Sequence, residues 1–330
     1  MTAHTSSLNV QNALLAALVP LPSICFYLAM LRYSIPDVDG VGRDETFWNA
    51  RWGALCKWGV RHPLGLLNVL FFLNVNLLFW FISFVQHSTW LIDLYWSILP
   101  VMITHYFSSH PLALYDQLRS KAVTLLVWIW SIRLTHSYFR RENWNWGERE
   151  DWRFSNLRKK HVKNWWWISF FIVYVSQQIF LVGICLPLYA IHRSQLPWTF
   201  WDALATGICV SGITIAYFAD TQLYRFVRGN SLLRELGGPT APVLEKGLWF
   251  YSRHPNYFGE QLWWWGLALY SWSVRQGWTV VGTCINSCCL AYVTVLVERK
   301  LLLKKTRTSA YKRYQQSTSV WIPWFKAELD

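Results

Sequence analysis

The sequence is short of charged residues. They make up only 15% of the 330 residues, whereas soluble proteins average about 25%. Apolar residues account for 53% of the chain and aromatic residues for 18%, with 24 tryptophans. A soluble domain needs a more polar surface, and a disordered chain carries far fewer apolar residues. The composition therefore excludes soluble, disordered, collagen-like and coiled-coil proteins and indicates a polytopic membrane protein.

The chain also lacks the patterns of metal sites and disulfide frameworks. No two cysteines have the CxxC spacing, and no histidines cluster at zinc spacing. Most of the seven cysteines lie inside apolar runs, where we expect them to pack as small membrane-embedded residues. No Lys or Arg precedes the first apolar run, so we expect that run to be kept as a membrane helix and not cleaved as a signal peptide. We expect no metal site.

Apolar runs divide the chain into seven or eight candidate membrane helices, because a spanning helix needs about 20 mostly apolar residues. The candidate spans are 13–31, 66–85, 90–107, 121–138, 166–190, 200–219 and 278–297, with a shorter eighth at 257–274. The expected fold is an all-α, polytopic transmembrane bundle of about seven or eight spans.

Basic residues concentrate in three of the segments between these spans. The net charge is +13, and Lys and Arg gather in 139–163, 220–255 and 298–313. Counting spans places all three segments on one face, which we assign to the cytoplasm because basic loops face the cytoplasm and its anionic lipids. The charge therefore predicts contact with membrane lipids and no binding of nucleic acid.

The most informative segment is GLWFYSRHPNYFGE, which covers Gly247–Glu260. Proline is favoured at the first position of a helix, so Pro255 predicts a helix start. Asn256 and Glu260 then lie one turn apart on one face, and we expect both to face a cavity that opens to the cytoplasm. Arg253 strengthens the anion site that the free amides of a helix start provide. The alternative is a positive-inside anchor followed by an ordinary membrane helix.

Two further groups of polar residues stand out. Asp220, Tyr224 and Arg228 recur every four residues and would form one stripe on a helix. That stripe is either a ligand-binding face or a solvated cap at the end of the 200–219 span. Arg133 lies inside the apolar run 121–138, where an ionisable residue faces a bundle interior or extends to the membrane surface.

The segment Gly247–Glu260, followed by WWWG, resembles the signature of a membrane family called domain of unknown function 1295, which is similar to the C-terminal domain of steroid 5-alpha reductases. Other matching pieces are Arg133-Leu-Thr135, Glu150-Asp-Trp-Arg153, Ala219-Asp-Thr-Gln222, Glu298-Arg299 and Tyr314 to Phe325. The resemblance divides the chain into N-terminal membrane helices, 1–120, without a recognised match, and a reductase-like membrane domain, 121–330.

The resemblance implies an NADPH-dependent reductase that acts on a carbon–carbon double bond of a lipophilic, steroid- or enone-like substrate. It assigns catalytic roles to Glu260 and Tyr257. The implied cofactor-binding residues are Arg133, Arg153, Asp220, Arg225, Arg228, Arg253, His254, Asn256, Arg299 and Tyr314. The segment 298–325 is expected to fold back over the cofactor or, being basic and amphipathic, to lie on the membrane surface.

Two other functions remain open. The triplet Arg253-His254-Pro255 is shared with sterol reductases and with isoprenylcysteine carboxyl methyltransferases. It therefore also suggests a lipid or prenylcysteine methyltransferase that uses S-adenosylmethionine. A non-catalytic, lipid-binding membrane protein is the third possibility. In a eukaryotic cell the endoplasmic reticulum is the expected location.

Overall fold

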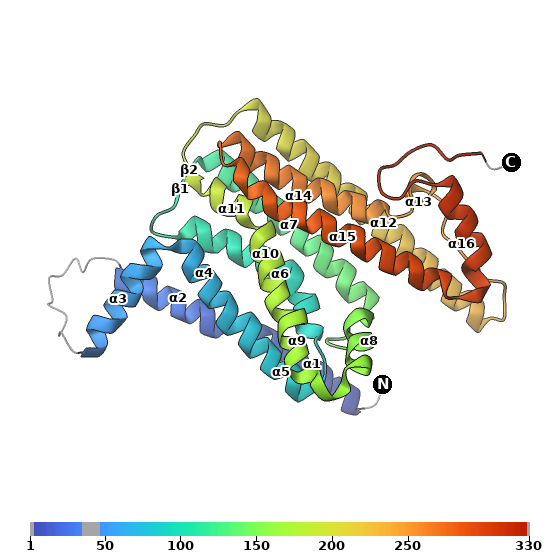
Figure 1. Cartoon of the computed structure of the whole chain (residues 1–330), viewed down its shortest axis with the longest axis horizontal. Helices are drawn as coiled ribbons and strands as arrows, with labels where there is room; N and C mark the ends of the chain where they lie inside the picture. Colours follow the sequence, from blue (N-terminus) through green and yellow to red (C-terminus); the bar gives the residue numbers. More distant parts are fainter. Residues whose placement is uncertain (1–2, 35–46, 329–330) are drawn as a thin grey trace. The chain divides into compact units, whose positions relative to one another are not determined.

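The computed structural model describes residues 3–34 and 47–328, and these residues form helices almost throughout (Figure 1). Within them, the only strands are β1 (Leu114–Tyr115) and β2 (Arg193–Ser194), which form a short parallel pair. The expected all-α fold is confirmed. Contacts between residues divide the chain into two compact units, 1–197 and 198–330.

The first unit contains both strands and most of the helices. Its helices are α1 (Ala3–Leu18), α2 (Leu21–Ser34), α3 (Phe47–Arg61), α4 (Pro63–Phe71), η1 (Phe72–Phe79), α5 (Trp80–Gln86), α6 (Trp90–Ser109), α7 (Gln117–Arg141), α8 (Trp152–Lys160), η2 (Val162–Asn164), α9 (Trp165–Ser169), η3 (Phe170–Val175), α10 (Ser176–Ile184) and α11 (Leu186–Ile191). The sequence-based domain boundary at residue 120 would separate α6 from nearly all of α7, yet these two helices pack together within this unit.

The second unit is built around a long helix. Its helices are α12 (Phe200–Glu235), α13 (Leu248–Tyr251), α14 (Pro255–Ser273), η4 (Gly277–Thr279), α15 (Val280–Leu302) and α16 (Lys305–Ser317). α14 lies between α12 and α15 and packs on both (Figure 1). α14 begins at Pro255, as the sequence predicts. α12 continues well past the predicted end of its span at residue 219, so Asp220 to Arg234 extend the same helix.

Among the residues that the structure describes, five helical segments are long and apolar enough to cross a membrane. They are Leu8–Tyr33, Pro63–Gln86, Val162–Ile184, Phe200–Glu235 and Gly277–Leu302. The chain is therefore an integral membrane protein. The remaining predicted spans correspond to α6, α7 and α14, whose polar residues, such as Asp93 and Arg133, lower their hydropathy. The count of seven or eight spans is not confirmed and stays a prediction.

A network of side-chain amides joins two of the membrane helices in the first unit. Asn76 donates to Gln178 at 2.6 Å, and Gln178 donates to the side chain of Asn68 at 2.8 Å. Asn76 and Gln178 lie in or directly after the π-helical turns η1 and η3. Amides inside a membrane segment need such partners because lipid offers none.

Replacing Gln178 with leucine is expected to lower the free energy of unfolding by about 1–2 kcal/mol, because Asn76 and Asn68 then lose their partner. Adding Asn76→Leu to this variant should recover part of the loss, since one unsatisfied amide is removed. Denaturant unfolding in detergent micelles measures both effects. A single variant as stable as the parent would contradict a structural role for the network.

Glycines bring α12 and α14 into backbone contact. A Cβ atom at Gly259 would lie 2.6 Å from the Ala216 nitrogen, and one at Gly212 would lie 2.6 Å from the Gly259 oxygen. Such close approach is typical of membrane helices packed through small residues. The sequence predicts that either another backbone or a ligand lies close to Gly259. In the structure, the backbone of α12 lies there.

Gly259→Ala is therefore expected to destabilise the protein by about 1–3 kcal/mol through overpacking. Gly207 provides a matched control on α12, because a Cβ atom there would meet nothing within 4 Å. Gly207→Ala should leave stability unchanged or raise it slightly, since alanine favours helix. Equal melting temperatures for the two variants in detergent would contradict the tight contact.

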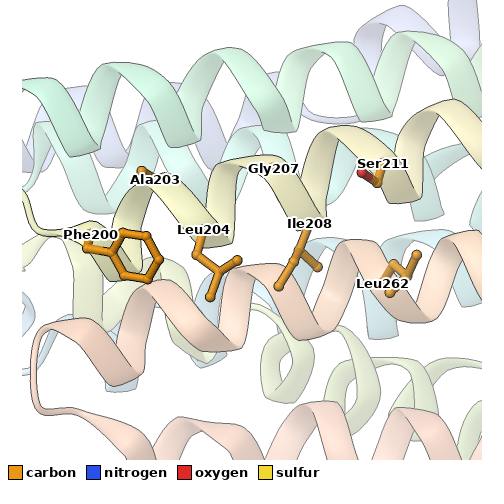
Figure 2. A pocket seen from close by; sticks show the side chains of 7 residues that line it. All are labelled: Phe200, Ala203, Leu204, Gly207, Ile208, Ser211 and Leu262. Carbon is orange, nitrogen blue, oxygen red and sulfur yellow. The ribbon is translucent and has the colours of Figure 1, made fainter.

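A shallow apolar groove runs along α12 beside its contact with α14 (Figure 2). Figure 2 shows Phe200, Leu204 and Ile208 of α12 and Leu262 of α14 along it, and its volume is about 620 Å³. None of its lining residues is charged, so the groove offers no group for acid–base chemistry.

Candidate functional site

A pocket of about 470 Å³ lies in the second unit, and five of the predicted site residues line it. α12 borders it from Leu223 to Arg234, and the segment 242–244, Trp249 of α13, the start of α14, the end of α15 and one side of α16 complete it. The five predicted residues are Arg253, His254, Asn256, Tyr257 and Tyr314. We refer to this space as the α12–α16 pocket.

Arg253 anchors the turn that begins α14. Its guanidinium donates to Glu298 Oε1 at 2.8 Å and to the carbonyl oxygens of Gln315 and Thr318 at 2.9 and 2.7 Å. The side chain is nearly buried, and a buried guanidinium requires such a complement of acceptors. The sequence analysis assigned Arg253 to an anionic ligand. The structure instead uses its donors to hold α15 and α16 against the turn.

Glu298 joins four side chains at the wall of the pocket. Besides Arg253, it accepts hydrogen bonds from His254 Nε2 at 3.1 Å, from the Tyr311 hydroxyl at 3.3 Å and from Gln315 Nε2 at 2.8 Å. The sequence analysis placed Glu298 only within a family match and gave it no role. Its position at the end of the apolar run 278–297 was the available signal, because a carboxylate near a membrane segment needs partners.

His254 and Tyr257 form a flat aromatic surface on the pocket. Their rings stack with centroids 5.1 Å apart and planes 11° apart. Nε2 donates to the Glu298 carboxylate, which can only accept, and this bond fixes the orientation of the imidazole. His254 is buried, and the stack is therefore a rigid element.

Asn256 presents an oriented amide to the pocket. Its Nδ2 donates to Asp220 Oδ1 at 3.1 Å. This bond joins the first turn of α14 to α12. Its Oδ1 is buried and has no hydrogen-bond partner among the residues that the structure describes. A buried acceptor without a partner lowers the stability of the folded protein. This oxygen is therefore the strongest candidate in the pocket for a hydrogen bond from a ligand.

Tyr314 lines the pocket, and the segment after it binds the turn that begins α14. The Tyr314 hydroxyl donates to the carbonyl oxygens of Ser252, at 3.1 Å, and Trp249. Backbone bonds then join Arg253 to Ser319 at 2.9 Å and His254 to Val320 at 3.0 Å. Burial raises the pKa of the Tyr314 phenol above its usual range, so the group stays a neutral donor. We call residues 318–324 the strap.

The remaining predicted residues lie elsewhere. Glu260 does not line the pocket although Asn256 does, because four residues advance α14 by about 6 Å. The α12–α16 pocket is therefore not a joint cavity of these two residues, and their common cavity stays a prediction. Arg225, Arg228 and Arg299 are exposed, with Arg228 donating to the Tyr224 hydroxyl at 3.3 Å, as the predicted stripe requires.

Arg133 and Arg153 belong to the first unit. Arg133 is buried within α7. Arg153 pairs with Asp151 at 2.6 Å, and Asp151 also caps the start of α8.

Three cations that the sequence analysis missed also line the pocket. They are Arg234 near the end of α12, Lys304 directly before α16 and Arg307 in the first turn of α16. No carboxylate is among the described residues that line the pocket. These three residues lie in the basic segments 220–255 and 298–313. The sequence did not single them out, because the excess of Lys and Arg in cytoplasmic loops explains such segments equally well.

Comparison with known proteins places the chain in a family. Residues 79–318 match the family described as "Protein of unknown function (DUF1295)". The chain therefore belongs to the DUF1295 family, as the residue pattern indicates. The match begins at residue 79, inside the part for which the sequence analysis recognised no resemblance. The relation to steroid 5-alpha reductases stays a prediction.

A protein of Schizosaccharomyces pombe, described as uncharacterised, is 27% identical over 241 residues, which cover 66% of this chain and 67% of that protein. No solved structure matches the chain significantly.

Proposed function

We propose that the protein is an NADPH-dependent reductase of a carbon–carbon double bond in a lipophilic, enone-like substrate, and that the α12–α16 pocket holds the cofactor. The observation that supports this proposal best is the composition of the pocket. It combines the unpartnered Asn256 oxygen and the His254–Tyr257 stack with a lining that carries cations and no carboxylate.

Each of these features suits one part of a nicotinamide dinucleotide. The Asn256 oxygen is an acceptor for the carboxamide N–H group. The His254–Tyr257 stack offers an aromatic face to a flat ring. The cations suit phosphate groups. S-adenosylmethionine fits this lining less well, because its sulfonium and ammonium groups give it a net positive charge.

The chain's residues supply positioning and a proton. NADPH, when bound, supplies a hydride for the β-carbon of the enone. Tyr257 donates a proton toward the enone oxygen, where negative charge develops. His254 supports the Tyr257 ring by stacking, and Glu298 holds His254 in place. Apolar residues such as Phe226 and Leu301 line the same space and help to exclude water.

Purified protein titrated with NADPH or with S-adenosylmethionine tests the proposal, because a ligand that binds only the folded state raises the melting temperature. We expect NADPH to stabilise the protein and to be consumed when lipophilic enones are added. The Arg253-His254-Pro255 triplet keeps the methyltransferase as a second candidate. Stabilisation by S-adenosylmethionine alone, with methyl transfer to a lipid or prenylated thiol, would replace the reductase proposal. Stabilisation by neither would favour a non-catalytic lipid-binding role.

A further inference from the structure

Three cations without an acidic partner among the described residues line the α12–α16 pocket. Arg234, Lys304 and Arg307 make no ion pair within residues 3–34 and 47–328. Two other basic side chains of the same unit have acidic partners. Arg253 is held by Glu298, and Lys326 pairs with Glu245 at 2.5 Å. Arg234, Lys304 and Arg307 differ from the other unpaired basic side chains of this unit because they line the pocket and can meet a ligand there.

The start of α16 adds to the positive potential at these residues. Lys304 is the residue before the first turn of α16, and its side chain makes no capping bond. The free N–H groups of a helix start attract anions, and a 13-residue helix has a full dipole. With no carboxylate on the lining, like charges repel one another until an anion is present.

We propose that Arg234, Lys304 and Arg307 bind a phosphate monoester. Two arginines and a lysine around a helix start suit a dianion with three acceptor oxygens, because guanidinium groups bind phosphate through paired hydrogen bonds. Resting on the function proposed above, this subsite selects NADPH over NADH, since the two cofactors differ only in the phosphate on the adenosine ribose. An anionic lipid headgroup, such as that of phosphatidic acid, carries the same chemical group.

The test measures affinity and not turnover. Full-length protein in phosphatidylcholine nanodiscs is titrated with NADPH and with NADH by calorimetry. We expect NADPH to bind the parent on the order of 10- to 100-fold more tightly. In the variant R234Q/K304Q/R307Q this ratio should fall to about one, while the affinity for NADH is unchanged.

A matched control separates the subsite from the general charge of the surface. The variant K305Q/K312Q/R313Q removes the same charge from exposed positions of α16 that do not line the pocket, and it should keep the parental ratio. A parent that binds both cofactors equally would overturn the proposal. So would a control variant that loses the ratio as the pocket variant does.

The experiment can contradict the proposed phosphate subsite and the proposed reductase function independently. If the parent binds neither dinucleotide, the function proposed above fails, and binding of phosphatidic acid, measured by native mass spectrometry, decides on the subsite. Weaker binding in the pocket variant, with parental binding in the control, supports a phosphate subsite for a lipid headgroup. Equal binding in both variants overturns it.

Discussion

Replacing Glu298 with glutamine is expected to lower the free energy of unfolding by about 3–5 kcal/mol, because the buried guanidinium of Arg253 then has no counter-charge. The variant also weakens the contacts of the carboxylate with His254 and Gln315. Denaturant unfolding in detergent micelles measures the loss.

The neighbouring residue supplies the control for this prediction. Arg299 is exposed, so Arg299→Gln should change stability by no more than about 0.5 kcal/mol. If Glu298→Gln and Arg299→Gln unfold at the same denaturant concentration, Glu298 does not hold α14, α15 and α16 together.

Tyr257→Phe is expected to lower the turnover of the proposed reductase by about 10²- to 10⁴-fold, the range typical of losing a general acid. The affinity for NADPH should change little, because phenylalanine keeps the ring that stacks on His254. Single-turnover measurements of NADPH oxidation, together with a binding titration, separate the two effects.

Tyr251 is the matched tyrosine for this experiment. It is exposed and does not line the pocket, so Tyr251→Phe should keep parental turnover. If Tyr257→Phe also keeps parental turnover, the Tyr257 hydroxyl is not the proton donor, and the side chain contributes only packing.

Local sequence signals predicted the parts of the fold that depend on neighbouring residues. Pro255 marks the start of α14 because a helix start tolerates its missing N–H. Apolar runs predicted the positions of membrane helices. The run that begins at residue 200 ends at residue 219, whereas α12 continues to Glu235. Where the side chains of a helix become polar, the helix leaves the apolar environment but its backbone stays helical. The end of an apolar run therefore does not mark the end of the helix.

The candidate site depends on contacts between distant residues, which sequence patterns describe poorly. Arg253 illustrates this limit. An arginine before a helix start suits a phosphate or a carboxylate equally well, and only the fold brings Glu298 to it. The same holds for the pocket cations, since Arg234 and Arg307 line the same pocket only because α12 and α16 both border it.

The strap gives the protein an order of assembly during synthesis. Arg253 bonds to the carbonyl of Thr318, which lies 65 residues further along the chain. A ribosome that has just released α14 therefore leaves behind an arginine whose acceptors have not yet been translated. Until residues 298–318 have been translated, the guanidinium lacks Glu298, Gln315 and Thr318 as acceptors. The turn that begins α14 therefore takes its final form only after α16 is complete.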